Sequence, residues 1–150
     1  MAGLRVTAEN SAAVALSAAT AKTILQLNAP ANQRLKLQRV GVFFDGSSTT
    51  AVPVLVRLVI ATTAGTNTAL TLNKLVSTDD ETIQSTAGEN ASAEPTKTTL
   101  LDQWLVHPQM GIDITYAFGQ ERVVAGGGRV ALECTAPASV NVRGKIDFEE

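Results

Sequence analysis

His107 is the only histidine of the chain, so any histidine-dependent triad or histidine-based metal cluster would have to include it. It lies in Leu105-Val106-His107-Pro108, at the end of a predicted strand, with no serine nucleophile elbow or cysteine partner nearby in the sequence. No spacing of Cys and His fits zinc, which needs three or four such ligands. We interpret His107 as a polar residue at a strand exit and predict no catalytic and no metal-binding residue.

Two other segments have residue types that bind ligands in other proteins. Gly126-Gly127-Gly128-Arg129 is glycine-rich like a phosphate cradle, but a P-loop continues with Lys and Ser or Thr into a helix, whereas Val130 to Cys134 has a strand pattern. The positive φ angles of a tight hairpin explain these glycines better. Asp79-Asp80-Glu81 lacks the alternating ligand spacing of a calcium loop, so we interpret it as a solvated loop. We expect no cofactor.

Carbohydrate chemistry is weakly indicated. The sequence leaves open whether two carboxylates form a glycoside-hydrolysing pair, because the fold decides the distance between them. Aromatic residues make up 4% of the chain, however, and Trp104 is its one tryptophan. Sugar sites commonly offer flat aromatic platforms, so we expect Trp104 in the core or at an interface.

The composition indicates a single domain whose surface has little charge. The chain has 150 residues, 45% of them apolar and 17% charged, and a formal net charge of −2. This charged fraction is below the ~25% typical of soluble domains. The surface is either rich in Ala and Thr and polar without ionisation, or partly covered by partners. Basic residues are interspersed with acidic ones, so no basic stripe indicates nucleic-acid binding.

Compartment and membrane signals are sparse. Cys134 is the one cysteine, and its apolar neighbours predict a buried thiol in a fold that needs no disulfide. No apolar run reaches the ~20 residues that span a bilayer, so no membrane is expected. The alanine-rich run Ala12 to Ala19 resembles a secretory signal but lacks a cationic segment before it, so we expect a chain made in the cytoplasm and not secreted. The sequon Asn90-Ala91-Ser92 means little outside a secretory context.

Apolar and polar residues alternate with a period of two along much of the chain, as in half-buried strands. The pattern is clearest over Val140–Phe148 and Val130–Cys134, and the short link Ala136-Pro137-Ala138 predicts that these two strands pair as antiparallel neighbours. A slip near Gln38-Arg39 predicts a β-bulge in the strand from Leu35 to Phe44. Further strands are predicted at 24–27, 54–60, 100–106, 112–116 and 123–124, with 54–60 covered on both faces.

Two segments are harder to assign. Residues 11–22 could form a capped helix, but an extended arm or first strand within residues 1–22 is slightly favoured. The stretch from Thr78 to Thr99 is expected to be mostly loop. The prediction is an all-β fold, residues 1–150 forming a single-domain β-sandwich or barrel of jelly-roll or Greek-key type with an N-terminal arm.

The C-terminal third resembles small proteins encoded beside the capsid genes of tailed bacteriophages and prophages. The similarity lies in His107-Pro108-Gln109-Met110-Gly111, Tyr116 to Glu121, Gly127 to Pro137, Val140-Asn141-Val142-Arg143 and the Phe148-Glu149-Glu150 end, with Ala29 to Arg34 and Val40 to Gly46 nearer the N-terminus. The resemblance implies a capsid decoration (cement) protein, a jelly-roll-like and often trimeric domain on the outside of a head shell. It implies no catalytic residue.

The expected function is therefore that of a non-enzymatic virion structural protein. Its expected partners are copies of itself, a trimer being favoured, and the major capsid protein or another virion protein. Residues Met1 to Asn10 are the expected arm that orders on contact. The alternative is a ligand- or receptor-binding jelly-roll module of a phage tail, fibre or lectin type. A cupin-type enzyme would need a histidine cluster, which the single His107 does not provide.

Overall fold

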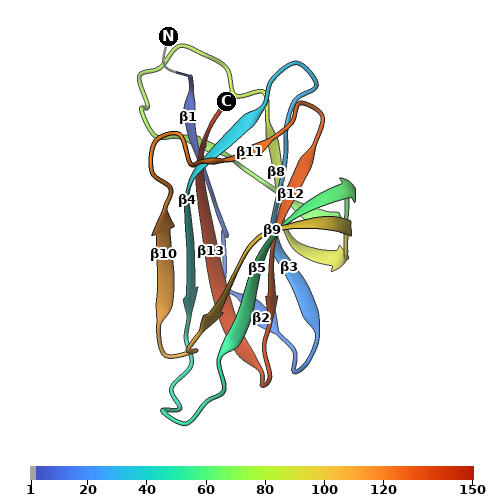
Figure 1. The fold of residues 1–150 in the computed structure, drawn as a ribbon, viewed down its shortest axis with the longest axis vertical. Coiled ribbons are helices and arrows are strands. Elements are labelled where there is room, and N and C mark those ends of the chain that lie inside the picture. The colour runs from blue at the N-terminus through green and yellow to red at the C-terminus, as the bar shows by residue number, and fades with distance from the viewer. Residues whose placement is uncertain (1–2) are drawn as a thin grey trace.

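The computed structural model describes residues 3–150, which form a sandwich of two sheets (Figure 1). It confirms the all-β class, and no helix occurs among the described residues. The strands are β1 Arg5–Glu9, β2 Val14–Leu16, β3 Ala21–Asn28, β4 Leu35–Phe44, β5 Val54–Thr63, β6 Thr66–Leu70, β7 Asn73–Lys74, β8 Thr86–Ala93, β9 Thr96–Val106, β10 Gly111–Thr115, β11 Arg122–Val124, β12 Arg129–Thr135 and β13 Val140–Glu149.

Sheet I has the strand order β10-β4-β13-β1-β7, with β11 also pairing β4 and β2 also pairing β13. Sheet II has the order β6-β8-β3-β12-β5-β9. All of these strand pairs are antiparallel. The chain crosses between the sheets at most of its connections, unlike a meander, and none of the described strands pairs with the strand that follows it in sequence.

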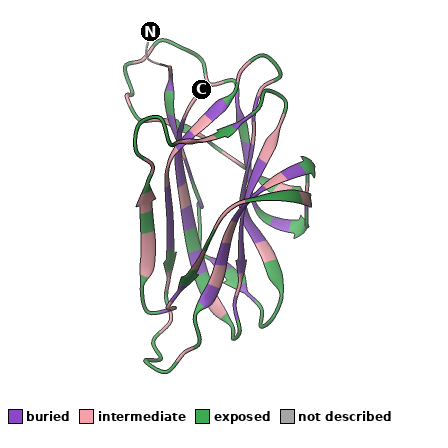
Figure 2. Ribbon diagram, in the orientation of Figure 1, coloured by how far each residue is buried: buried purple, intermediate pink, exposed green. Residues whose placement is uncertain are grey.

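The core lies between the inner faces of the two sheets, where the buried segments of Figure 2 face one another. Sheet I contributes Leu37, Ile146 and Phe148, and sheet II contributes Leu58 and Leu132, all with 0% exposure. Large aliphatic side chains at alternate positions of β4, β5, β12 and β13 fill this layer, as the period-two pattern predicts.

The pairing of β12 with β13 predicted from the sequence is wrong. Both strands exist, but β12 lies in sheet II between β3 and β5, whereas β13 lies in sheet I beside β4 and β1. Residues 136–139 therefore lead from one layer of the sandwich to the other. The same correction applies to residues 125–128, which join β11 of sheet I to β12 of sheet II and are not a hairpin turn, although Gly127 has the expected positive φ of 73°.

The first and the last described strands, β1 and β13, both lie in sheet I. In β1, Val6 and Ala8 are fully buried, and β1 pairs with β13 from Arg5↔Glu149 to Glu9↔Lys145. The expected free arm over Met1 to Asn10 is thus wrong for residues 4–10, because their apolar side chains belong to the core; Met1 and Ala2 lie outside the described residues. Residues 11–22 form β2 and the start of β3 instead of a helix.

Single-residue bulges adjust the β4–β13 and β3–β12 ladders, and further register shifts occur in the β5–β9 and β6–β8 ladders. Between β4 and β13, Arg39 pairs with Asp147 and Leu37 with Phe148, so Gln38 is the extra residue, which confirms the predicted slip. Between β3 and β12, Leu25 pairs with Leu132 and Thr23 with Glu133, so Ile24 is extra.

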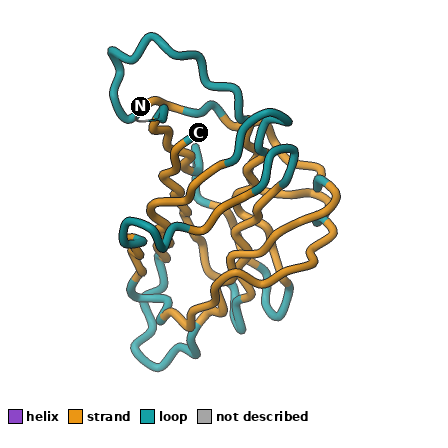
Figure 3. The backbone as a smooth tube through the Cα atoms, turned by 45° about the horizontal axis from the view of Figure 1, so that its top comes forward, coloured by secondary structure: helices purple, strands orange, loops and turns teal. Residues whose placement is uncertain are grey.

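A long two-stranded ribbon bends over the outer face of sheet II (Figure 3). The first half of the ribbon is the β5–β9 pair, and the second half is the β6–β8 pair. The ribbon bends at residues 64–65 and 94–95. Beyond this bend, β8 also pairs with β3. The stretch from 78 to 99, expected to be mostly loop, therefore contains β8 and the start of β9. Because the bent ribbon covers this face, Val59, Ala91 and Ala131 are buried beneath it.

Candidate functional site

The strongest candidate site is one end of the sandwich, where four connections meet: residues 17–20, 45–53, 107–110 and 136–139. We call it the loop end; in Figure 1 it lies at the bottom, opposite the end of the sandwich where β1 begins and β13 ends. Its connections are tied together, because Gly46 donates a 2.8 Å backbone hydrogen bond to Pro108 and the Gln109 side chain donates one of 2.8 Å to the Ser47 carbonyl. The two-layer fold thus brings together segments that lie far apart in sequence.

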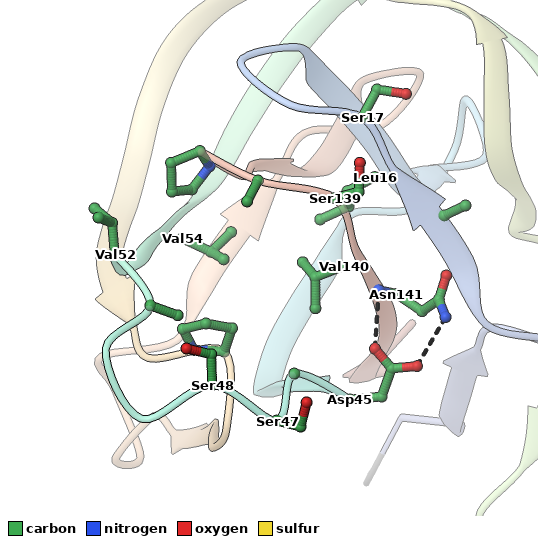
Figure 4. A pocket seen from close by; sticks show the side chains of 16 residues that line it. Leu16, Ser17, Asp45, Ser47, Ser48, Val52, Val54, Ser139, Val140 and Asn141 are labelled. Atoms are coloured by element: carbon green, nitrogen blue, oxygen red, sulfur yellow. Dashed lines mark hydrogen bonds between the residues drawn. The ribbon is translucent and has the colours of Figure 1, made fainter.

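A groove of about 680 Å³ opens at the loop end (Figure 4). Its floor is formed by the margin of the core, since Leu16 and Val54 line the groove and are only 2% and 1% exposed. Val52, by contrast, is 63% exposed. The lining residues are Ala15, Leu16, Ser17, Asp45, Gly46, Ser47, Ser48, Ala51, Val52, Val54, Pro108, Pro137, Ala138, Ser139, Val140 and Asn141.

The loop end contains two ionisable residues, Asp45 and His107, and the Asp45 carboxylate is already bound. The Asn141 side-chain amide donates to one carboxylate oxygen at 2.7 Å and the Asn141 backbone N–H to the other at 3.0 Å, the two dashed bonds of Figure 4. These hydrogen bonds, the side-chain one first, hold the pKa of Asp45 below its usual range. The loop end therefore presents apolar side chains, hydroxyls and backbone amides, with one negative charge at its margin.

The opposite end differs in charge. The connections there include Arg34, Asp79, Asp80 and Glu81, and the Glu150 carboxylate accepts hydrogen bonds from the backbone N–H groups of residues 84 and 85. A charge-poor surface loses less hydration when another protein covers it, so the loop end is better suited to a protein contact than the charged end.

The residues that the sequence offered for chemistry do not converge. His107 lies in the turn after β9, where its Nδ1 accepts a 3.2 Å hydrogen bond from the Gln109 backbone. Asp79-Asp80-Glu81 lies in the connection from β7 to β8, at the charged end. Within residues 3–150, no group of three or more His, Cys, Asp or Glu side chains is arranged to hold a metal ion.

Two single residues lie where their patterns predicted. Cys134 is 0% exposed in β12, and burial, followed by the charge of Glu133, raises the pKa of its thiol. Trp104 is half-buried against the core. In the described part of the chain, no helix has the length and apolarity needed to cross a membrane.

A second cluster, which sequence reasoning missed, lies beneath the bent ribbon. Glu133 of β12 is 3% exposed, and its carboxylate binds Lys97 of β9 and lies 3.6 Å from Arg57 of β5. Lys97 also binds Glu94, at 2.7 Å. The alternation of β12 placed Glu133 on a solvent-facing side, and only the bend of the ribbon brings its partners over it.

Glu94 also completes the ladder at the Ile24 bulge. Its carboxylate accepts the Thr23 backbone N–H at 2.9 Å and the Thr23 hydroxyl, while the Ile24 carbonyl accepts the side chain of Asn10 at 2.8 Å. Burial alone would raise the pKa of Glu94, but the hydrogen bonds from Lys97 and Thr23 outweigh it and lower that pKa. This cluster is an ion network in which the carboxylates of Glu94 and Glu133 both have cationic partners, so we assign it to holding the ribbon in place.

No family model and no curated protein matches this chain.

Proposed function

We propose that this protein is a non-enzymatic virion structural protein, a capsid decoration protein that binds the outside of a phage head shell as an oligomer, with a trimer favoured. The observation that supports it best is the loop end, a groove-bearing surface assembled from four connections with Asp45 and His107 as its two ionisable residues. The similarity of the C-terminal third to proteins encoded beside capsid genes is the second support.

In this proposal the loop end is the surface that lies on the shell. Apolar side chains around the groove, among them the 63% exposed Val52, would pack against the capsid protein. Each copy would contribute a modest interface. Three linked copies would then bind tightly, because attachment of one raises the effective concentration of the others at their sites.

Co-sedimentation tests this function. The purified chain is mixed with empty head shells assembled from the major capsid protein encoded in the same genome, and the bound fraction is measured. Val52→Asp should lower the apparent affinity at least tenfold, because it places a charge at the contact. Phe118→Asp is the matched control, since Phe118 is 99% exposed in the connection from β10 to β11 and lies outside the loop end. Absence of wild-type binding, or equal binding by Val52→Asp, would contradict the proposal.

A ligand- or receptor-binding module is the second candidate, and the volume of the groove favours it. About 680 Å³ falls within the range of small-molecule sites. Of the described residues that line the groove, however, none is aromatic, which weakens a sugar-binding role. Glycan-array binding that Val52→Asp abolishes, together with no shell binding, would favour this candidate.

A further inference from the structure

We infer that copies of this chain join through the side of the sandwich between β9 and β10, with β9 of one copy pairing with β10 of the next. We call this the β9–β10 side; the inference deepens the proposed oligomeric function and rests on it. β9 is the last strand of sheet II and β10 the last strand of sheet I. The four-residue turn 107–110, closed by a 2.9 Å bond from the Met110 N–H to the His107 carbonyl, joins them, so both free edges lie on one side of the molecule (Figure 1).

The edge of β9 lacks the usual protection against pairing. Proteins guard edge strands with lysines, prolines or bulges. From Asp102 to Val106 the pairing of β9 with β5 has no register shift, and the shifts all lie closer to the start of β9. β9 contains no proline, and its one lysine, Lys97, is bound to Glu94 and Glu133 beneath the ribbon. The half of β9 that ends at Val106 is therefore a regular strand edge without a guarding charge.

The charges near this edge are already paired. The Asp102 carboxylate accepts two bonds from the Arg122 guanidinium, at 2.7 and 2.9 Å, and one of 2.8 Å from the Tyr116 hydroxyl. On β10, Asp113 is bound to Arg39 of β4. A strand that approaches either edge would meet no unpaired charge from these residues.

Apolar side chains border the two edges. Leu105 is 73% exposed and Met110 is 67% exposed, while Trp104 and Ile112 are half-buried against the core. Tryptophan and methionine are enriched in protein interfaces, and a contact here would remove this apolar surface from water. Because the 107–110 turn belongs to both surfaces, the β9–β10 side is continuous with the loop end.

The two edges complement each other, and this identifies the occupant as a second copy. The regular part of β9 and the whole of β10 each span five residues. They run in opposite directions, because one tight turn joins them. Rotation about an axis parallel to the strands preserves these directions, so β9 of one copy would meet β10 of the next in antiparallel orientation. A ring of three copies satisfies both edges in every copy.

Light scattering coupled to chromatography, with two edge variants, tests this inference. Leu105→Lys blocks β9 and Thr115→Lys blocks β10, each by placing a lysine on an exposed edge position. The wild type should have three times the 15.7 kDa mass of the chain, and each variant alone the mass of one chain. An equimolar mixture of the two variants should form pairs, since each retains one intact edge. Leu75→Lys, at a 43% exposed leucine beside β7, is the control and should remain a trimer.

Each other outcome decides against the inference. A wild-type monomer, or a Leu105→Lys variant that keeps the wild-type mass, overturns it. Thr115→Lys with unchanged mass would mean that β10 takes no part. Circular dichroism verifies folding, and Gln103→Lys replaces Leu105→Lys if the latter does not fold. Shell binding by a wild-type monomer would overturn this inference and the oligomeric part of the proposed function but leave shell binding itself, whereas a trimer that does not bind shells would overturn the proposed function alone.

Discussion

The Oδ1 atom of Asn10 lies 2.8 Å from the backbone nitrogen of Gly144 and accepts its hydrogen bond. The amide nitrogen of the same side chain donates to the Ile24 carbonyl at 2.8 Å and to the Glu89 carboxylate at 3.1 Å. Asn10 is 3% exposed, so one buried amide connects β13 of sheet I to β3 and β8 of sheet II.

Asn10→Ala should destabilise the protein by about 3 kcal/mol, because it leaves several buried polar groups without partners. Urea unfolding followed by circular dichroism measures the change. Asn73→Ala, at an exposed position of β7, is the control and should stay within about 0.5 kcal/mol of the wild type. A loss below about 1 kcal/mol for Asn10→Ala would mean that water replaces the lost bonds.

Gly144→Ala should cost about 1–3 kcal/mol through overpacking. A Cβ atom at this position would lie 2.7 Å from Cδ1 of Ile24 and 3.0 Å from Cδ2 of Leu132, inside the core between the sheets. Gly41→Ala is the control, because its new Cβ would lie 3.1 Å from the ring of the 48% exposed Phe43 and 3.8 Å from Oδ1 of Asp113, outside the core. Equal melting temperatures for the two variants would contradict this prediction.

Deletion of residues 1–10 should abolish cooperative folding. The deletion removes β1 from between β13 and β7 and takes Leu4, Val6 and Ala8 out of the core. Circular dichroism and thermal unfolding report the result. A truncated chain that retains a sharp melting transition would restore the view of this segment as a dispensable arm.

Acid stability should depend on Glu94. Its pKa is lower in the folded protein than the ordinary value of 4.5, so its contribution is present above that pH and is lost as the pH falls through the folded-state pKa. Glu94→Gln should therefore lose less stability between about pH 5 and 3 than the wild type does. Glu81→Gln, in the exposed acidic loop, should follow the wild-type curve, and parallel curves for all three proteins would refute the role of Glu94.

The thiol of Cys134 should not react with a thiol reagent in the native protein. The side chain is fully buried, so the reagent cannot reach the sulfur. Burial also raises the pKa of the thiol, so the reactive thiolate form is scarce. One thiol per chain should react at once in denaturant. Rapid labelling under native conditions would show that β12 opens frequently.

Local patterns predicted strands well and their partners poorly. The alternation from Val140 to Phe148 and the slip at Gln38 were both readable, because each depends on the pleat of one strand. The partners of β12 and β13 could not be predicted in this way, since a short link can join two neighbouring strands of one sheet or two strands in different sheets. β8 escaped notice because its Thr, Ala, Gly, Glu and Asn residues lack apolar alternation.

The candidate site was hidden from the sequence for the same reason. The charge-poor loop end is made of connections whose proximity depends on the strand order, and no motif marks Asp45 and Asn141 as neighbours. A low overall charge was the one available signal. It indicated that some of the surface lacks charge without locating it.

The position of β13 has a consequence for how the molecule is made. Sheet I is organised around β13, which pairs with β1, β2 and β4, yet β13 is synthesised after all the other strands of that sheet. The earlier strands of the sheet must wait, with their apolar faces exposed, until β13 has been made. Since non-local pairings also close slowly, we expect refolding over milliseconds to seconds, and during synthesis a window in which chaperones can bind.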